Sequence, residues 1–120
     1  MTTIKSYTNI KQSKKLAEIL PLESADYHYI AQGEKSYFYP YSLSSDAVKD
    51  YDEEIKYIPC WSLSALLGVL EHPRCFQGDK PIYWFCGCFG KDNLYHEVEA
   101  DNPIDACVAM IEKLHELKLL

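Results

Sequence analysis

Hydrophobic residues recur at helical spacing along the last twenty residues of the chain. Asn102 is a favoured N-cap residue, and Pro103 follows at the first helical position, where the missing N–H of proline costs nothing. The apolar positions after it fall on one face of a helix: Ile104, Cys107, Val108, Ile111 and Leu114. The pattern predicts a C-terminal helix that packs this face against the rest of the protein.

Two further helices are predicted upstream. One covers residues 9–20, with Asn9 as its cap and Gln12 at the capping-box position. The other begins after Ser62 and ends at His72-Pro73. Its leucines follow the i, i+3, i+4, i+7 spacing of a buried helix face: Leu63, Leu66, Leu67 and Leu70.

Aromatic and β-branched residues predict the strands. One strand is predicted over residues 26–31 and a second, short strand over residues 37–41. The second is expected at the edge of a sheet, because Pro40 has no N–H to donate to a neighbouring strand. Residues 81–89 are the strongest strand, with residues 94–99 as its hairpin partner. The Gly-Lys-Asp-Asn segment between them has the composition of a tight turn.

This order of elements predicts one α+β domain over residues 1–120. We expect a small antiparallel sheet of three or four strands, with two or three helices packed on one face. Residues 42–56, rich in Ser, Asp and Glu, are interpreted as a surface excursion. Because the C-terminal helix follows directly on the hairpin, it is expected to cover one sheet face. The opposite face, on which some of the aromatic residues fall, is then the place to look for function.

Composition and charge narrow the class of protein. A chain of 120 residues, 48% hydrophobic and 25% charged, is typical of one globular domain. No apolar run approaches the roughly 20 residues that span a bilayer, and the N-terminus lacks a signal-peptide core. We therefore expect a cytoplasmic protein that does not enter a membrane. The net charge of −6 disfavours nucleic acid as a partner.

The five cysteines suggest a second, chemical hypothesis. An odd number without a signal peptide favours reduced thiols over a disulfide framework. Cys86 and Cys88 are two apart on a predicted strand and share a face, so with His96 they could bind a metal, with Cys60 or Cys75 as a fourth ligand. Packing beneath a helix explains the same cysteines without a metal. No Cys, His or carboxylate arrangement follows a catalytic signature, so the sequence favours a non-enzymatic protein.

Ten tyrosines and two tryptophans are the strongest hint of a binding surface. Tyrosine and tryptophan are favoured at recognition surfaces, although tyrosine is also ordinary in strands. The binding candidates are Tyr27, Tyr29, Tyr37, Tyr39 and Trp61. The leading hypothesis is a protein–protein interaction or accessory module, without a cofactor, that binds another protein or a second copy of itself. The alternative is a small metal- or thiol-dependent protein.

Three blocks of the chain, residues 12–26, 58–67 and 100–107, resemble a known set when taken together in order. The resemblance is to a family of short, uncharacterised proteins from gut anaerobes and their phages or other mobile elements. It implies a cytoplasmic accessory protein of a mobile element. The resemblance gives no activity, cofactor or site residue that could be transferred to this chain.

Overall fold

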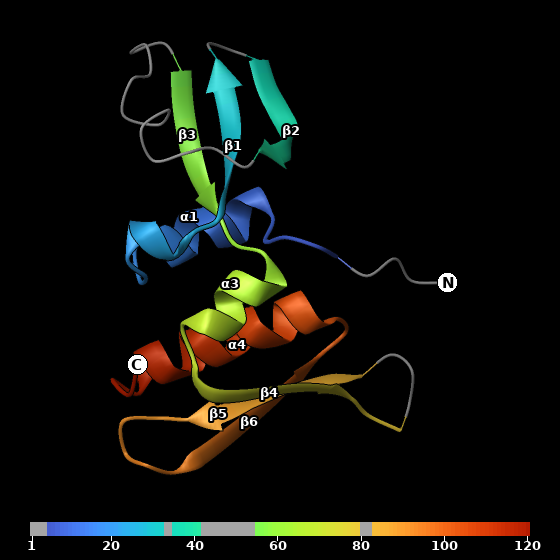
Figure 1. Cartoon of the computed structure of the whole chain (residues 1–120), viewed down its shortest axis with the longest axis vertical. Coiled ribbons are helices and arrows are strands. Elements are labelled where there is room, and N and C mark those ends of the chain that lie inside the picture. The colour runs from blue at the N-terminus through green and yellow to red at the C-terminus, as the bar shows by residue number, and fades with distance from the viewer. Residues whose placement is uncertain (1–4, 33–34, 42–54, 80–82) are drawn as a thin grey trace.

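Two three-stranded antiparallel sheets, with helices between them, make up the fold (Figure 1). The computed structural model describes residues 5–32, 35–41, 55–79 and 83–120. The predicted α+β class, with helices packed on a small antiparallel sheet, is confirmed. The second sheet goes beyond the single sheet expected from sequence, and it arises because two strands form where none was predicted.

The first sheet has β1 (Tyr27–Gln32) at its centre, between β2 (Lys35–Tyr41) and β3 (Ile55–Cys60). The edge strand predicted at residues 37–41 is confirmed as part of β2. β3 was not predicted, and its first two residues were wrongly included in the surface excursion; residues 42–54 of that excursion lie outside the described part of the chain. Both outer strands carry a proline opposite β1, since Pro40 pairs with Tyr29 and Pro59 with His28. Proline is tolerated there because an edge strand needs hydrogen bonds on one side only.

The second sheet has the order β4 (Glu71–Gln77), β5 (Trp84–Phe89), β6 (Tyr95–Ala100). The hairpin of β5 and β6 is confirmed, and Asn93 N–H donates to the Gly90 carbonyl across its turn at 3.0 Å. The prediction that His72-Pro73 lies only at a helix end was wrong, because both residues belong to β4. The pairing with β5 shifts register between Glu71 and Arg74, so Pro73 lies in an irregular stretch of an edge strand.

The helices begin at the caps that the sequence predicts. Asn9 forms both hydrogen bonds of a capping box with Gln12, and Ser62 Oγ accepts from the Ala65 N–H. Asn102 Oδ1 accepts from the Asp105 N–H at 2.9 Å. The helices are α1 (Ile10–Ala17), the short 3-10 helix η1 (Leu22–Ser24), α3 (Leu63–Gly68) and α4 (Pro103–Glu116).

The hydrophobic core lies between α4 and the second sheet and continues into α3 and α1. α4 packs on β5 and β6, as predicted for a helix that follows the hairpin. Fully buried side chains of this core include Leu16, Trp61, Leu66, Cys86, Cys107, Met110 and Ile111. None of the helices in the described ranges has the length and hydropathy to cross a membrane.

Candidate functional site

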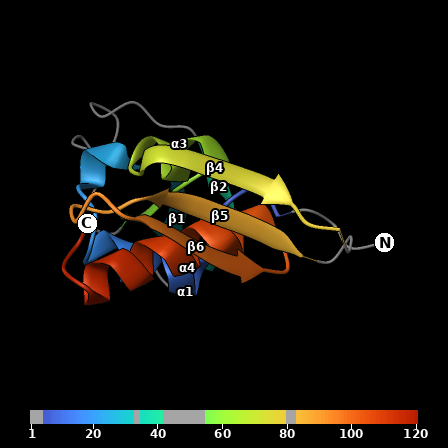
Figure 2. The same cartoon turned by 90° about the horizontal axis from the view of Figure 1, so that it is seen from below.

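The face of the second sheet that points away from α4 carries four aromatic side chains. Seen from below, β4, β5 and β6 run side by side with the helices behind them (Figure 2). Strand alternation turns Cys75, Cys86 and Val98 toward α4 and turns their neighbours outward. The outward aromatic residues are Phe76 on β4, Phe85 and Phe89 on β5, and Tyr95 on β6. We call the surface formed by these four side chains and by Arg74, Glu97 and Glu99 the outer face.

The four rings form two contacting pairs that remain open to solvent. Phe76 stacks on Phe85, with ring centroids 5.2 Å apart, and Phe89 meets Tyr95 edge-on at 5.7 Å. Phe76, Phe89 and Tyr95 are 39%, 40% and 41% exposed. Aromatic pairs of this geometry stabilise the sheet, but large rings that stay this exposed on one surface are typical of a contact site. The outer face is therefore the strongest candidate for binding in the described part of the protein.

Gly87 lies at the centre of the outer face and lets the Tyr95 ring rest on the sheet. A Cβ atom at Gly87 would come within 1.9 Å of the Tyr95 hydroxyl oxygen, so any larger residue displaces the ring. The Tyr95 hydroxyl donates to Glu97 Oε2 at 3.0 Å. Burial and the nearby Glu97 carboxylate raise the pKa of Tyr95, so this hydroxyl stays protonated near neutral pH. Because Gly87 has no side chain, the Tyr95 ring can lie against β5 and adds apolar surface to the outer face.

The β4 edge of the outer face carries charges of both signs, Glu71 beside Phe89 and Arg74 beside Gly87, and the β6 edge is acidic. Arg74 on β4, Gly87 on β5 and Glu97 on β6 form one row across the sheet. The next row places Glu99 on the β6 edge, opposite Phe85. Neither Arg74 nor these two β6 glutamates forms an ion pair with another described residue. The ion pairs among the described residues are Lys5–Asp105, Lys15–Glu112 and His96–Asp92.

The tyrosines and the tryptophan predicted to bind a partner lie elsewhere. Trp61 is fully buried, and its Nε1–H donates to Ser24 Oγ at 2.9 Å. Tyr29 is 8% exposed, and Tyr27 is half-buried with its ring against Tyr7 at 4.7 Å. Tyr37 and Tyr39 belong to β2, and their side chains lie outside the described part of the molecule. The interior positions of Trp61 and Tyr29 give these two residues a role in holding the fold together.

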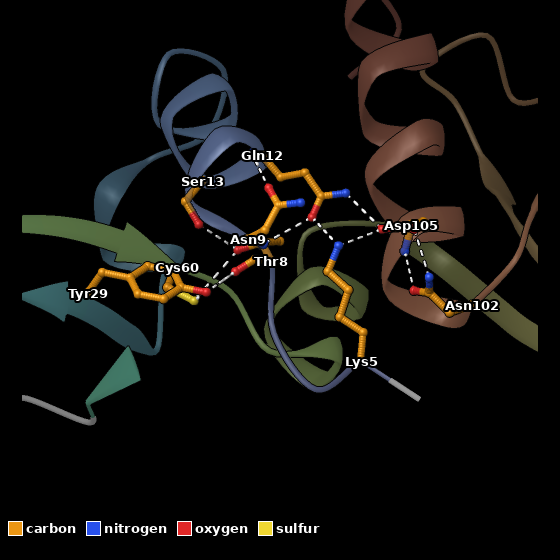
Figure 3. A network of polar contacts seen from close by, with 9 residues as sticks. All are labelled: Lys5, Thr8, Asn9, Gln12, Ser13, Tyr29, Cys60, Asn102 and Asp105. Atoms are coloured by element: carbon orange, nitrogen blue, oxygen red, sulfur yellow. Dashed lines mark hydrogen bonds and ion pairs between the residues drawn. The ribbon is translucent and has the colours of Figure 1, made fainter. Parts of the chain in front are cut away.

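Tyr29 belongs to a polar network that fastens the first sheet to the helices (Figure 3). Its hydroxyl donates to the Thr8 carbonyl at 2.7 Å, and the Cys60 thiol donates to the same oxygen at 3.5 Å. The buried Thr8 hydroxyl accepts from the Trp61 N–H at 3.1 Å and bonds with Ser13 Oγ at 2.8 Å. Because every buried polar group here finds a partner, the network stabilises the junction.

A second part of the same network joins the starts of α1 and α4. Lys5 Nζ donates to Gln12 Oε1 at 2.7 Å and to Asp105 Oδ1 at 2.8 Å. Gln12 Nε2 donates to the same carboxylate oxygen at 2.8 Å. Burial acts to raise the pKa of Asp105, but the hydrogen bonds from Lys5, Gln12 and Asn102 outweigh it, and the pKa is lowered. Asp105 therefore stays ionised and cross-links the two capped helices.

The predicted metal ligands are brought only partly together. Cys86 and Cys88 are fully buried beneath α4, and Cys88 lies opposite His96 in the ladder. His96 Nε2 instead bonds with Asp92 Oδ2 at 3.0 Å in the hairpin turn. Burial, with a smaller effect of Cys86, raises the pKa of Cys88 to about 11, which disfavours the thiolate that metals bind. Within the described ranges, no group of three or more Cys, His, Asp or Glu side chains is arranged to hold a metal ion.

Comparison of the chain with models of protein families, with curated proteins and with solved structures finds no match. The geometry of the outer face thus carries the functional argument. The sequence pointed to this side of the hairpin, but none of the four rings was among the predicted binding residues. Phe85, Phe89 and Tyr95 lie on strands that were predicted, whereas Arg74 and Phe76 lie on β4, which was not. The segment Arg74-Cys75-Phe76-Gln77 does not alternate polar with apolar residues, so its local pattern gave no strand signal.

Proposed function

We propose that the protein is a non-enzymatic interaction module that associates with a second copy of itself through the outer face of the second sheet. The observation that carries the proposal is the group of exposed rings on the sheet face opposite α4. A net charge of −6 supports a protein partner over a nucleic acid.

The rows of the sheet support a second copy as the partner. Consider two copies placed face to face about a two-fold axis parallel to β5. Rotation about this axis exchanges the two edges of the sheet, so β4 of one copy faces β6 of the other. The position along the strands is unchanged, so each residue faces a residue of the same row in the other copy. Arg74 then lies opposite Glu97 of the other copy, twice, and Phe85 and Phe89 lie opposite their own equivalents. In the flanking rows Glu99 lies opposite Phe76, and Glu71 lies opposite Tyr95, of the other copy, so the charges are complementary in the Arg74–Glu97 row and the rings of Phe85 and Phe89 supply the apolar contact.

The size of the outer face sets the expected affinity. Three strands about 4.8 Å apart, with roughly six residues each, present a small surface. Interfaces of this size lie at the low end of the range for specific complexes. We therefore expect a reversible dimer with a dissociation constant in the micromolar range, on the order of 1–100 µM.

Sedimentation equilibrium over a wide concentration range tests the proposal. Wild-type protein is expected to move from monomer to dimer, and a Phe76→Ser, Phe89→Ser double variant is expected to remain monomeric. Leu117→Ser is the matched control, because Leu117 is an exposed apolar residue, 52% accessible, at the end of α4 and away from the outer face. A wild-type protein that stays monomeric to about 500 µM, well above this affinity range, contradicts the proposal. So does a double variant that dimerises as the wild type does.

The wider biological setting is supported by the resemblance of three sequence blocks to proteins of gut anaerobes and their mobile elements. On this basis we assign the module an accessory role in such an element, in the cytoplasm. Fractionation of the native host tests the location. Recovery of the protein outside the cytoplasm would contradict this part of the proposal.

A further inference from the structure

The last strand of the second sheet, β6, has an open hydrogen-bonding edge. It pairs with β5 on one side, and no described strand lies on its other side (Figure 2). Gly90 N–H donates to the Leu94 carbonyl at 3.1 Å, and hydrogen-bonded pairs alternate with non-bonded pairs along an antiparallel ladder. Every second residue from Leu94 onward therefore bonds to β5. The residues between them direct their backbone N–H and C=O groups to the open edge: Tyr95, Glu97 and Glu99.

The other edge of β5 agrees with this assignment. Gly78 N–H donates to the Tyr83 carbonyl at 2.9 Å, so the bonded pairs between β4 and β5 include Phe85 and Gly87. Cys86, which lies between these two, is left to bond with β6. The backbone groups of the three β6 edge residues have no hydrogen-bond partner among the described residues.

β6 differs from the other outer strands of the two sheets. β2, β3 and β4 each contain a proline, and the register of β4 is also irregular. Proline and irregular register keep a further strand from pairing with a sheet edge. β6 has no proline, and its register with β5 is unbroken from Tyr95 to Ala100. It is therefore the outer strand on which a further strand can pair regularly.

The edge residues of β6 also select the charge of such a strand. The side chains of Glu97 and Glu99 are exposed on the outer face. In a hydrogen-bonded antiparallel pair, the residue that bonds to a glutamate backbone places its own side chain beside that carboxylate, with Cα atoms about 5.5 Å apart. A second copy of β6 would bring glutamate beside glutamate, which is destabilising, whereas lysine or arginine would form opposite-charge pairs.

We propose that β6 accepts a basic, extended segment of a partner protein as an added antiparallel strand, with lysine or arginine at the residues that bond to Glu97 and Glu99. The residues between them turn to the inner side of the sheet, beside Val98, which packs half-buried against the core. Apolar residues fit there, so the segment alternates basic with apolar residues. Self-association uses the face of the sheet and this contact uses its backbone edge, so neither proposal depends on the other.

Isothermal titration calorimetry at low salt, with synthetic peptides and the unmodified protein, tests the inference. The acetylated peptide Lys-Val-Lys-Val-Lys-Val is expected to bind with a dissociation constant below about 1 mM. The equivalent Glu-Val peptide is expected to bind at least about tenfold more weakly.

Two N-methylated peptides of unchanged charge separate strand addition from general attraction to an acidic protein. Methyl groups on the backbone nitrogens of the lysines block the edge that faces β6 and are expected to weaken binding at least about tenfold. Methyl groups on the valine nitrogens lie on the opposite edge of the peptide and are expected to leave the affinity within about twofold.

Two measurements on the protein locate the contact. The Lys-Val peptide is expected to slow hydrogen exchange at the amides of Glu97 and Glu99, and to leave the amide of Val98, already bonded to β5, unchanged. Glu99→Gln is expected to weaken peptide binding roughly two- to fivefold. Glu71→Gln is the matched control, an exposed glutamate on the opposite edge strand, and is expected to bind the peptide as wild type does.

Three results would overturn the inference. The first is wild-type protein that does not bind the Lys-Val peptide at about 1 mM. The second is equal affinity for the two N-methylated peptides. The third is bound peptide that leaves exchange at Glu97 and Glu99 unchanged. Each of these results leaves the proposed face-to-face dimer untouched, because that dimer is measured without peptide.

Discussion

At the scale of single residues, Gly87 determines the shape of the outer face. The Tyr95 ring occupies the space that a Cβ atom would fill, so Gly87→Ala must move the ring or the strand. Overpacking in a closed core costs about 1–3 kcal/mol, but the atoms in the way here are the far end of the exposed Tyr95 side chain, so we expect a loss of at most about 1 kcal/mol. Urea denaturation is expected to show a lower free energy of unfolding by that amount.

Gly68→Ala is the matched control for this prediction. Gly68 ends α3, and a Cβ atom there meets nothing within 4 Å. Alanine has a higher helix propensity than glycine, so this variant is expected to be more stable by up to about 1 kcal/mol. Equal stability losses in the two variants would show that the space above Gly87 is not filled by Tyr95.

Asp105 makes the stability of the fold depend on pH in the acidic range. Its pKa is lowered in the folded state from the ordinary value of 3.8, so its contribution is fully present above that value and is lost as the pH falls through the lower folded value. Because Asp105 and Lys5 are partly exposed, we expect a contribution of at most about 1 kcal/mol. Melting temperatures of wild type and Asp105→Asn, measured from pH 6 to about pH 2.5, are expected to converge at the acidic end. A constant difference across this range would contradict the assignment.

Residue-level prediction from sequence succeeded where partners are close along the chain. The caps Asn9, Ser62 and Asn102 were found because each bonds to an N–H three residues away. The Lys5–Asp105 contact was not found, because it joins positions 100 residues apart and depends on how the helices meet.

At the scale of elements, α3 is short and depends on its N-cap residue, Ser62. Ser62 Oγ accepts from the Ala65 N–H at 3.2 Å, and the Ser62 N–H donates to Asp26 Oδ1 at 2.9 Å. Removing the cap in Ser62→Ala is expected to lower the free energy of unfolding by about 0.5–2 kcal/mol. Ser64→Ala, at an exposed position in the same helix, is expected to be neutral or slightly stabilising. Chemical denaturation of both variants checks the cap, and equal effects would contradict it.

The strands missed from sequence share a physical cause. β3 and β4 each contain a proline and mix charged with apolar residues, so their local pattern predicts loops. They form because β1 and β5 each have a free edge with which they can hydrogen-bond. This pairing depends on distant residues, so the local sequence does not predict it. The central strand β5 and its hairpin partner β6 were predicted because their hydrophobic pattern and turn are local.

At the scale of the whole molecule, the helices cover the inner face of the second sheet and leave its outer face open (Figures 1 and 2). The C-terminal helix, which the sequence predicts most clearly, has no binding role of its own in this account. It fixes which side of the hairpin is core and which side carries exposed rings. We propose that two copies of the protein bring these outer faces together, with Arg74 of one copy opposite Glu97 of the other.

A mixing experiment with charge-reversed variants tests this claim most directly. Arg74→Glu alone and Glu97→Arg alone each place like charges opposite one another in both symmetric contacts, so each is expected to weaken self-association by about tenfold or more. An equimolar mixture restores opposite charges in both contacts and is expected to form a heterodimer at least as readily as wild type dimerises. Sedimentation equilibrium at low salt, with circular dichroism to confirm that both variants are folded, measures the outcome. A mixture of folded variants that associates no better than either variant alone would contradict the account.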